Sequence, residues 1–128
     1  MRQINLLIIH CSATNENQSF TLQALEASHQ KRGFDGIGYH YYIRQSGEVI
    51  NTRPLSRIGA HAKGYNRNSI GICYEGGLDK VGKPKDTRTL EQRRLIIELQ
   101  LRFPGCKVCG HRDLSPDLNR NGKIVTRE

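Results

Sequence analysis

The sequence predicts an α/β domain, and three observations support that prediction. The run Leu-Leu-Ile-Ile at 6–9 is continuously apolar, which is typical of a strand buried on both faces of a parallel sheet. Residues 21–32 and 89–103 carry apolar side chains at helical spacing. A turn at 46–47 (Ser-Gly) separates two strand-like runs and predicts a hairpin. The length suits one domain, so we assign residues 1–128 to it.

The composition is that of a soluble, basic protein. Hydrophobic residues make up 36% of the chain, the mean hydropathy is −0.61 and the formal net charge is +8. This charge favours an acidic partner, either nucleic acid or a cell wall that bears phosphate and carboxylate groups. The apolar run at 6–9 is too short for a signal peptide, and no stretch approaches transmembrane length. We therefore expect a monomer that is synthesised in the cytoplasm without a signal peptide and does not insert into membranes.

The cysteines (Cys11, Cys73, Cys106 and Cys109) lie mostly in apolar, strand-like stretches. We expect them to be reduced and buried, as in a cytoplasmic protein. The run C-K-V-C-G-H at 106–111 matches neither of two known motifs. Haem attachment requires the histidine directly after the second cysteine, and a zinc ribbon requires a second C-x-x-C.

His10 ends the first predicted strand. Open α/β sheets place their sites at the carboxyl ends of buried strands, so His10 is a candidate functional residue. A core histidine that is hydrogen-bonded to the backbone is the alternative. The helix that follows begins at Thr21 and ends before Gly33, and it carries His29 on its apolar stripe. We assign His29 a packing role.

The middle of the chain contains glycine-rich loops between strands. The run 33–38 precedes a strand rather than a helix, which excludes a phosphate cradle. The loop 60–68 is long, polar and contains glycine, which is typical of a binding loop. The strand that follows, 69–74, includes Gly71, whose missing side chain lets another group approach closely. A basic loop at 76–87 comes next.

The second helix begins with a capping box formed by Thr89 and Gln92. A short strand at 106–110 then leads directly to His111. Two strands therefore end in a histidine, His10 and His111, and a catalytic zinc requires two or three imidazoles. Their spacing alone leaves open whether the two side chains meet.

Four segments carry a family resemblance, in the order in which that family has them. They are I-I-H-C-S-A-T (8–14), G-I-G-Y-H-Y (36–41), H-A-K-G-Y-N-R-N-S-I-G-I (61–72) and G-H-R-D-L-S-P (110–116). These segments resemble the type 2 N-acetylmuramoyl-L-alanine amidases, the family of the zinc-dependent phage amidase-lysozymes and the peptidoglycan-recognition proteins. The resemblance implies a mixed central β-sheet flanked by α-helices, with zinc at the rim of the sheet.

The resemblance also implies the functional residues. His10 and His111 match the metal-binding histidines of the family, and Tyr39 matches the tyrosine beside the metal. His61 and Asn66 match the loop that lines the substrate groove, and His40 lies beside it. Ordinary strand packing is the alternative for Tyr39 and the expected role of His40. The implied reaction is hydrolysis of the amide between N-acetylmuramic acid and L-alanine in peptidoglycan. Zinc would lower the pKa of its bound water to about 7, and Tyr39 would help to deprotonate that water or stabilise the oxyanion.

The chain departs from the family after His111. The third zinc ligand of the family, a cysteine or aspartate, corresponds to Asn119, which is a poor ligand for zinc. The assisting lysine or threonine of the family corresponds to Asp117. We expect the third ligand to lie in a segment after residue 128. Cys109 is a weaker alternative, since residues i and i+2 share a face of a strand.

Residues 117–128 satisfy D-x-[DN]-x-[DN]-G-x5-E, the calcium loop of an EF-hand. The ligands would be Asp117, Asn119, Asn121, the carbonyl of Lys123 and Glu128. Pro116 directly before this run prevents a normal entering helix, and a chance match in a turn-rich tail is the alternative. We interpret 117–128 as an inserted loop with weak affinity for Ca2+.

Three functions are consistent with these observations. The first is a zinc amidase of peptidoglycan, similar to an endolysin, which acts on the cell wall after release or holin-type export. The second is a non-catalytic peptidoglycan-binding module that lacks the third zinc ligand. The third, a nucleic-acid binder, is supported by net charge alone, because neither an aromatic-studded strand face nor a recognition helix is recognisable. We therefore expect peptidoglycan, and no nucleic acid, as the partner.

Overall fold

The computed structural model describes residues 3–16, 22–31, 33 and 36–110. Its centre is a five-stranded sheet with the strand order β4-β3-β5-β1-β7. The strands are β1 (Leu6–Cys11), β3 (Tyr41–Ile43), β4 (Val49–Asn51), β5 (Ser69–Tyr74) and β7 (Lys107–Gly110). β3 and β4 pair antiparallel, whereas β3–β5, β5–β1 and β1–β7 pair parallel. The sheet is therefore mixed, as the family resemblance implied.

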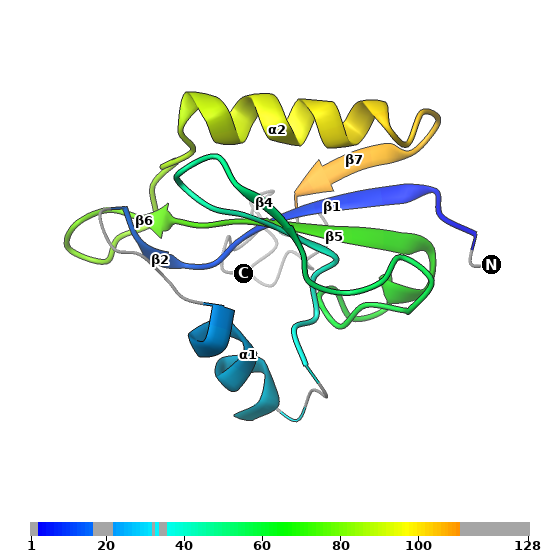
Figure 1. Cartoon of the computed structure of the whole chain (residues 1–128), viewed down its shortest axis with the longest axis horizontal. Helices are drawn as coiled ribbons and strands as arrows, with labels where there is room; N and C mark the ends of the chain where they lie inside the picture. The colour runs from blue at the N-terminus through cyan, green and yellow to red at the C-terminus, as the bar shows by residue number, and fades with distance from the viewer. Residues whose placement is uncertain (1–2, 17–21, 32, 34–35, 111–128) are drawn as a thin grey trace, which may run out of the picture.

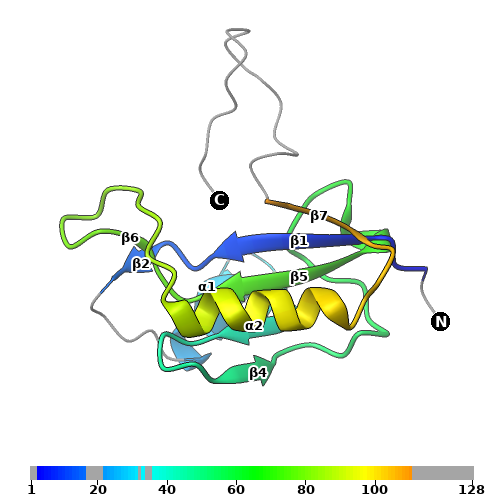
Figure 2. The same cartoon turned by 90° about the horizontal axis from the view of Figure 1, so that it is seen from above.

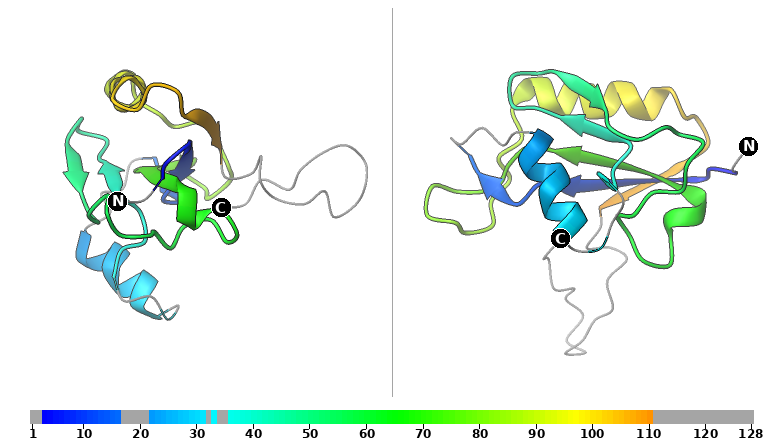
Figure 3. Two further views of the ribbon diagram at one scale, coloured as in Figure 1. Left: turned by 90° about the vertical axis from the view of Figure 1, so that its right-hand side faces the viewer. Right: turned by 60° about the horizontal axis from the view of Figure 1, so that its bottom comes forward.

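The two helices lie on opposite faces of this sheet (Figures 1 and 3). They are α1 (Leu22–Lys31) and α2 (Leu90–Leu101). Alternation along the strands sends successive side chains to the two faces. The main core cluster lies on the α2 face, where Leu7 and Ile72 pack with Ile96. On the α1 face, Leu25 packs with Tyr42 and Cys73.

The start of α2 confirms the predicted capping box. The backbone N–H of Gln92 donates to Thr89 Oγ1 (3.1 Å), and the backbone N–H of Thr89 donates to Gln92 Oε1 (3.0 Å). The buried amide of Gln92 also donates from Nε2 to the carbonyl oxygens of Ile43 (3.2 Å) and Glu75 (3.0 Å). One side chain thus caps the helix and fastens it to β3 and to the end of β5.

The other predicted elements are present with small shifts in their bounds. The β3–β4 hairpin turns at Gly47, which has a φ of +93° and donates from its N–H to the carbonyl of Arg44. Such a positive φ favours glycine. Gly33, with the same φ, follows α1 as predicted, while the predicted cap Thr21 lies outside the described residues. Within the described ranges, the structure contains no helix long and apolar enough to cross a membrane.

A second, small sheet was not predicted. Its strands are β2 (Thr14–Asn15) and β6 (Gly77–Leu78), which pair parallel beyond the ends of β1 and β5 (Figure 2). A short 3-10 helix, η1 (Asn66–Asn68), lies within the predicted loop 60–68 and was not predicted either. Strands of two residues are too short to show a periodicity, and β6 lies within the predicted basic loop 76–87.

The prediction of buried cysteines was wrong for three positions. Only Cys73 is buried, because it faces α1 from a central strand, whereas Cys11, Cys106 and Cys109 are half-buried. All four are thiols rather than disulfides in the described part of the chain, as predicted.

Candidate functional site

β1 carries His10 to the carboxyl end of the sheet. Its side chain is only 2% exposed, and its backbone is in register with Cys73 of β5. Leu6, Ile8 and His10 share one face of β1 by alternation, which is the face opposite to α2. His10 is therefore held on a rigid element, on the α1 side of the sheet.

Tyr39 lies beside His10. The two ring centroids are 5.0 Å apart, and their planes are inclined by 52°. Tyr39 lies two residues before the start of β3. Its carbonyl oxygen accepts a hydrogen bond of 2.6 Å from Thr52 Oγ1. The ring of His29 lies on Tyr39 as well, at 5.1 Å between centroids. The phenol is thus positioned between β1 and α1.

His61 completes a cluster with these two residues, which we call the histidine–tyrosine cluster (His10, Tyr39 and His61). His61 Nδ1 lies 2.9 Å from His10 Nε2, with the two ring planes perpendicular. His61 Nε2 lies 3.3 Å from Ser69 Oγ at the start of β5. Segments far apart in the sequence therefore bring three aromatic, proton-exchanging side chains together.

Two glycines make room for the imidazole of His61. A Cβ added at Gly71 would lie 2.6 Å from the ring of His61, and one added at Gly59 would also lie 2.6 Å from it. Real Cβ atoms do not approach so closely, so any larger residue would displace the ring. The prediction that Gly71 permits a close approach is confirmed, and His61 is the group that approaches.

Asn66 holds the loop that carries His61. Its Oδ1 accepts hydrogen bonds from the backbone N–H groups of His61 (3.0 Å) and Ala62 (2.9 Å). The predicted pair His61 and Asn66 is therefore in direct contact. Binding of substrate by these two residues stays a prediction, because their described contacts are with the protein itself.

The remaining described histidines pack as predicted. His29 is 3% exposed, and its Nδ1 accepts from the backbone N–H of Gly38 at 2.8 Å. His40 is fully buried, and its Nδ1 accepts from the N–H of Gly71 at 3.1 Å. His40 Nε2 donates to the carbonyl oxygen of Arg57 at 2.8 Å. Both ring nitrogens of His40 are thus used by the backbone, which agrees with a structural role.

The described residues alone do not form a metal site. No three His, Cys, Asp or Glu side chains gather in a metal-binding group in the described part of the chain. Cys109 faces the same side of the sheet as His10 but packs with Leu6, Ile8 and Ala62. The other predicted ligands lie outside the described residues: His111 for zinc, and Asp117, Asn119, Asn121, Lys123 and Glu128 for calcium.

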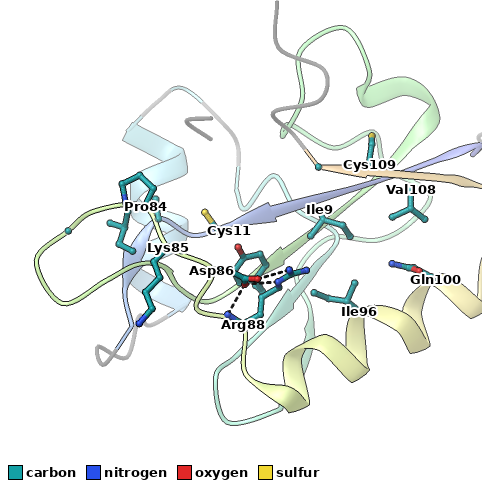
Figure 4. A pocket seen from close by; sticks show the side chains of 16 residues that line it. Ile9, Cys11, Pro84, Lys85, Asp86, Arg88, Ile96, Gln100, Val108 and Cys109 are labelled. Atoms are coloured by element: carbon teal, nitrogen blue, oxygen red, sulfur yellow. Dashed lines mark hydrogen bonds and ion pairs between the residues drawn. The ribbon is translucent and has the colours of Figure 1, made fainter. Parts of the chain in front are cut away.

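A cavity of about 940 Å³ is separate from the histidine–tyrosine cluster. Ile9 and Val108 line it from the sheet, and Ile96 lines it from α2, whereas Cys109 points away from α2 (Figure 4). Its rim carries an ion pair, in which Arg88 holds the pKa of Asp86 well below its usual range through hydrogen bonds and charge. This cavity lies mainly on the α2 face, and none of the cluster residues lines it.

The fold and the cluster define a class of protein: an α/β domain with histidine and tyrosine side chains gathered at the carboxyl edge of a mixed sheet. Comparison with known proteins narrows this class. The family model described as N-acetylmuramoyl-L-alanine amidase matches residues 1–123. The chain belongs to this family of peptidoglycan amidases, as the sequence predicted.

Individual relatives agree in sequence and in fold. The endolysin of Klebsiella phage KP32 is 33% identical over 119 residues, which cover 90% of this chain and 79% of the endolysin. The N-acetylmuramoyl-L-alanine amidase LysC from Clostridium intestinale URNW superposes with a TM-score of 0.70 and 28% identity, over 88% of this chain and 73% of LysC. A mutant of Drosophila PGRP-LB in complex with tracheal cytotoxin has a TM-score of 0.67 and 26% identity, over 89% and 73% of the two chains. The predicted fold class is confirmed.

Proposed function

We propose that this protein is a zinc-dependent amidase that hydrolyses the bond between N-acetylmuramic acid and L-alanine in peptidoglycan. The observation that carries the proposal is the placement of His10 beside Tyr39 at the carboxyl end of β1, in a chain of the amidase family. A candidate metal ligand on β1 and a candidate proton donor in the segment before β3 are thus neighbours, as catalysis requires.

The donor set fits a zinc ion. His10 contributes an imidazole, and His111 follows Gly110, whose partner in β1 is Ile9, the residue before His10. The residues that directly precede the two histidines are therefore paired with each other across β1 and β7. Zinc bound by them would lower the pKa of water to about 7 and polarise the scissile carbonyl. A third ligand would come from outside the described residues, with Cys109 as the alternative on the same face.

The side chains of this protein have definite tasks in the proposed reaction. Water adds to the carbonyl carbon, the bond between carbon and nitrogen breaks, and the alanine nitrogen takes up a proton. The hydroxyl of Tyr39 donates a hydrogen bond to the carbonyl oxygen as negative charge develops on it. The loop 60–68 lines the substrate groove through His61 and Asn66, and its exposed Lys63 and Arg67 suit the carboxylates of a peptide stem.

The setting of the reaction is part of the proposal. We place the synthesis of the protein in the cytoplasm without a signal peptide, and its action on the cell wall after release or holin-type export. The endolysin of phage KP32 supports this setting, since it is a relative of this chain. The protein acts as a monomer on muramyl peptides, and nucleic acid is not its partner.

Zinc content and product formation together test the proposal. The wild-type chain should bind zinc, measured by atomic spectroscopy, and should release new L-alanine amino groups from purified peptidoglycan in proportion to its zinc content. His10→Ala and His111→Ala should each retain less than about a tenth of the zinc, with an unchanged circular dichroism spectrum. Full zinc occupancy in either variant would contradict the assignment of that ligand.

The same experiment decides between the amidase and a binding-only module. Asn119 at the position of the third ligand favours the module, because an amide is a poor zinc ligand. A module would sediment with peptidoglycan and release no amino groups, whether or not zinc is added. An amidase would release them in proportion to its zinc content.

A further inference from the structure

We infer that His61 is a positioning residue for His10: it fixes the tautomer and the orientation of that imidazole so that Nδ1 is presented to the metal. The inference rests on the proposed zinc site, and it gives His61 a role in addition to the proposed contact with the substrate. Metal-binding histidines commonly use their second ring nitrogen for a hydrogen bond that orients the ring. In this protein the partner is another imidazole.

The contact itself is short and specific. His10 Nε2 and His61 Nδ1 are 2.9 Å apart, a distance typical of a hydrogen bond between ring nitrogens. The ring planes are perpendicular, with centroids 4.9 Å apart, so the rings meet edge-on rather than by stacking. His10 is 2% exposed, which leaves little water to compete for this bond.

The line of hydrogen bonds continues to Ser69 and determines where the protons lie. A neutral imidazole has one N–H donor and one acceptor nitrogen. If His10 donates from Nε2, then His61 accepts at Nδ1 and donates from Nε2 to Ser69 Oγ, 3.3 Å away. In this arrangement the lone pair of His10 is on Nδ1, where a metal can bind.

The reverse arrangement does not suit a metal ligand. There His61 donates from Nδ1 to His10 Nε2, so the proton of His10 lies on Nδ1. Metal binding by His10 would then require the loss of either that proton or the hydrogen bond to His61. Zinc at Nδ1 and the hydrogen bond at Nε2 are compatible only in the first arrangement, so each stabilises the other.

The surroundings of His61 hold its ring in place. Asn66 Oδ1 accepts the backbone N–H of His61 at 3.0 Å, and the missing Cβ atoms of Gly59 and Gly71 leave the space that the ring occupies. The fit agrees with a residue that positions a ligand of the metal.

The first test reads the tautomer of His10 without any metal. Long-range proton–nitrogen NMR of the zinc-free protein at about pH 8, where imidazoles are neutral, should show His10 with its proton on Nε2. On addition of zinc, the Nδ1 resonance should move and the Nε2 proton should remain. A proton on Nδ1 in the zinc-free protein, or metal binding through Nε2, would overturn the inference.

The second test compares two replacements of His61. In His61→Asn the side-chain oxygen can take the place of the Nδ1 acceptor, whereas His61→Leu fills similar space without an acceptor. Zinc affinity, measured by competition with a chromophoric chelator, should fall about 10- to 100-fold in His61→Leu and should recover largely in His61→Asn. His29→Asn, which keeps an acceptor for the N–H of Gly38 at the position of Nδ1, should bind zinc as the wild type does.

The outcomes separate this inference from the proposed function. Equal zinc affinity in wild type and His61→Leu would overturn the role of His61 and leave the zinc site standing. Equal losses in His61→Leu and His61→Asn would show that only packing matters, which also overturns it. Absence of zinc from the wild-type chain would contradict the proposed function. The NMR measurement would then still decide whether His61 sets the tautomer of His10. If His61→Leu does not fold, Ser69→Ala should weaken zinc binding severalfold while keeping both imidazoles.

Discussion

The ring of Tyr39 lies 5.0 Å from the ring of His10, and the two side chains come from segments that do not pair with each other directly. Tyr39 comes shortly before β3, His10 lies on β1, and β5 separates β3 from β1 in the sheet. The distance between phenol and imidazole therefore depends on how these three strands pack. The backbone of Tyr39 is fixed by Thr52, and that of His10 by the register with Cys73. Any function that needs both groups at once is therefore a property of the folded sheet.

The first prediction concerns the hydroxyl of Tyr39. Tyr39→Phe should lower kcat by about 100-fold, because it removes the hydroxyl that donates to the developing oxyanion. KM for peptidoglycan fragments and zinc content should stay at wild-type values. Steady-state kinetics with atomic spectroscopy checks this. An effect confined to KM would show that Tyr39 binds substrate and takes no part in the chemical step.

The second prediction concerns Gly71. Gly71→Ala should destabilise the protein by about 1–3 kcal/mol, because the new methyl group would overlap the ring of His61. Zinc affinity should fall in the same variant. Gly36→Ala is the matched control, since a Cβ there meets nothing within 4 Å. Urea denaturation of the two variants should differ clearly, and equal stability would mean that the ring of His61 moves aside without cost.

The third prediction concerns the first turn of α2. Gln92→Leu should cost about 2–4 kcal/mol of folding free energy, because it removes half of the capping box and leaves the carbonyls of Ile43 and Glu75 without this donor. Glu98→Ala, at an exposed position of the same helix, should change stability by no more than about 0.5 kcal/mol. Chemical denaturation measures both. A small effect at Gln92 would show that water replaces the lost donors.

The fourth prediction is a dependence on alkaline pH. Burial, with the nearby Cys73 and Glu75, raises the pKa of Tyr42 well above its ordinary value. The folded protein then retains a proton that the unfolded chain releases above about pH 10, so stability is full below that pH and falls as pH rises. Between about pH 8 and pH 11, the wild type should lose more stability than Tyr42→Phe. Parallel urea titrations check this, and equal losses in both proteins would exclude Tyr42 as a source of alkaline sensitivity.

The fifth prediction concerns residues 117–128, which lie outside the described residues. Only Asp117 and Glu128 contribute charge to the calcium pattern, so a Kd of about 10⁻⁴ to 10⁻³ M is expected. Calorimetry should detect weak binding to the wild type and none to Asp117→Ala, with zinc content equal in both. Identical heats would reduce the pattern to a coincidence of sequence.

Much of the fold could be predicted because the relevant signals are local. β5 has the bounds that the apolar run 69–74 indicated, and the capping box of Thr89 and Gln92 begins α2 at the predicted place. Burial on both faces makes a strand continuously apolar, and a cap is a pattern of four residues. Both can be recognised without knowledge of the tertiary structure.

The contact between His10 and His61 could not be predicted in the same way. Nothing in the spacing of these residues indicates that the loop 60–68 folds back over β1. The only local signal was Gly71, which indicated that some group approaches β5 but not which one. The parallel pairing of β2 and β6 was missed for a similar reason, since each strand has two residues and the pairing is long-range.

The strand order has a consequence for the synthesis of the protein. Leu6 pairs with Ser69 on one side and with Lys107 on the other, so β1 is synthesised before both of the strands with which it pairs. Such non-local parallel pairing is slow, because the intervening loops must be ordered before the contacts form. The contacts of His10 with Tyr39 and His61 therefore form only after those later segments have been synthesised. The histidine–tyrosine cluster is thus absent from the isolated N-terminal segment and forms only when the sheet is assembled.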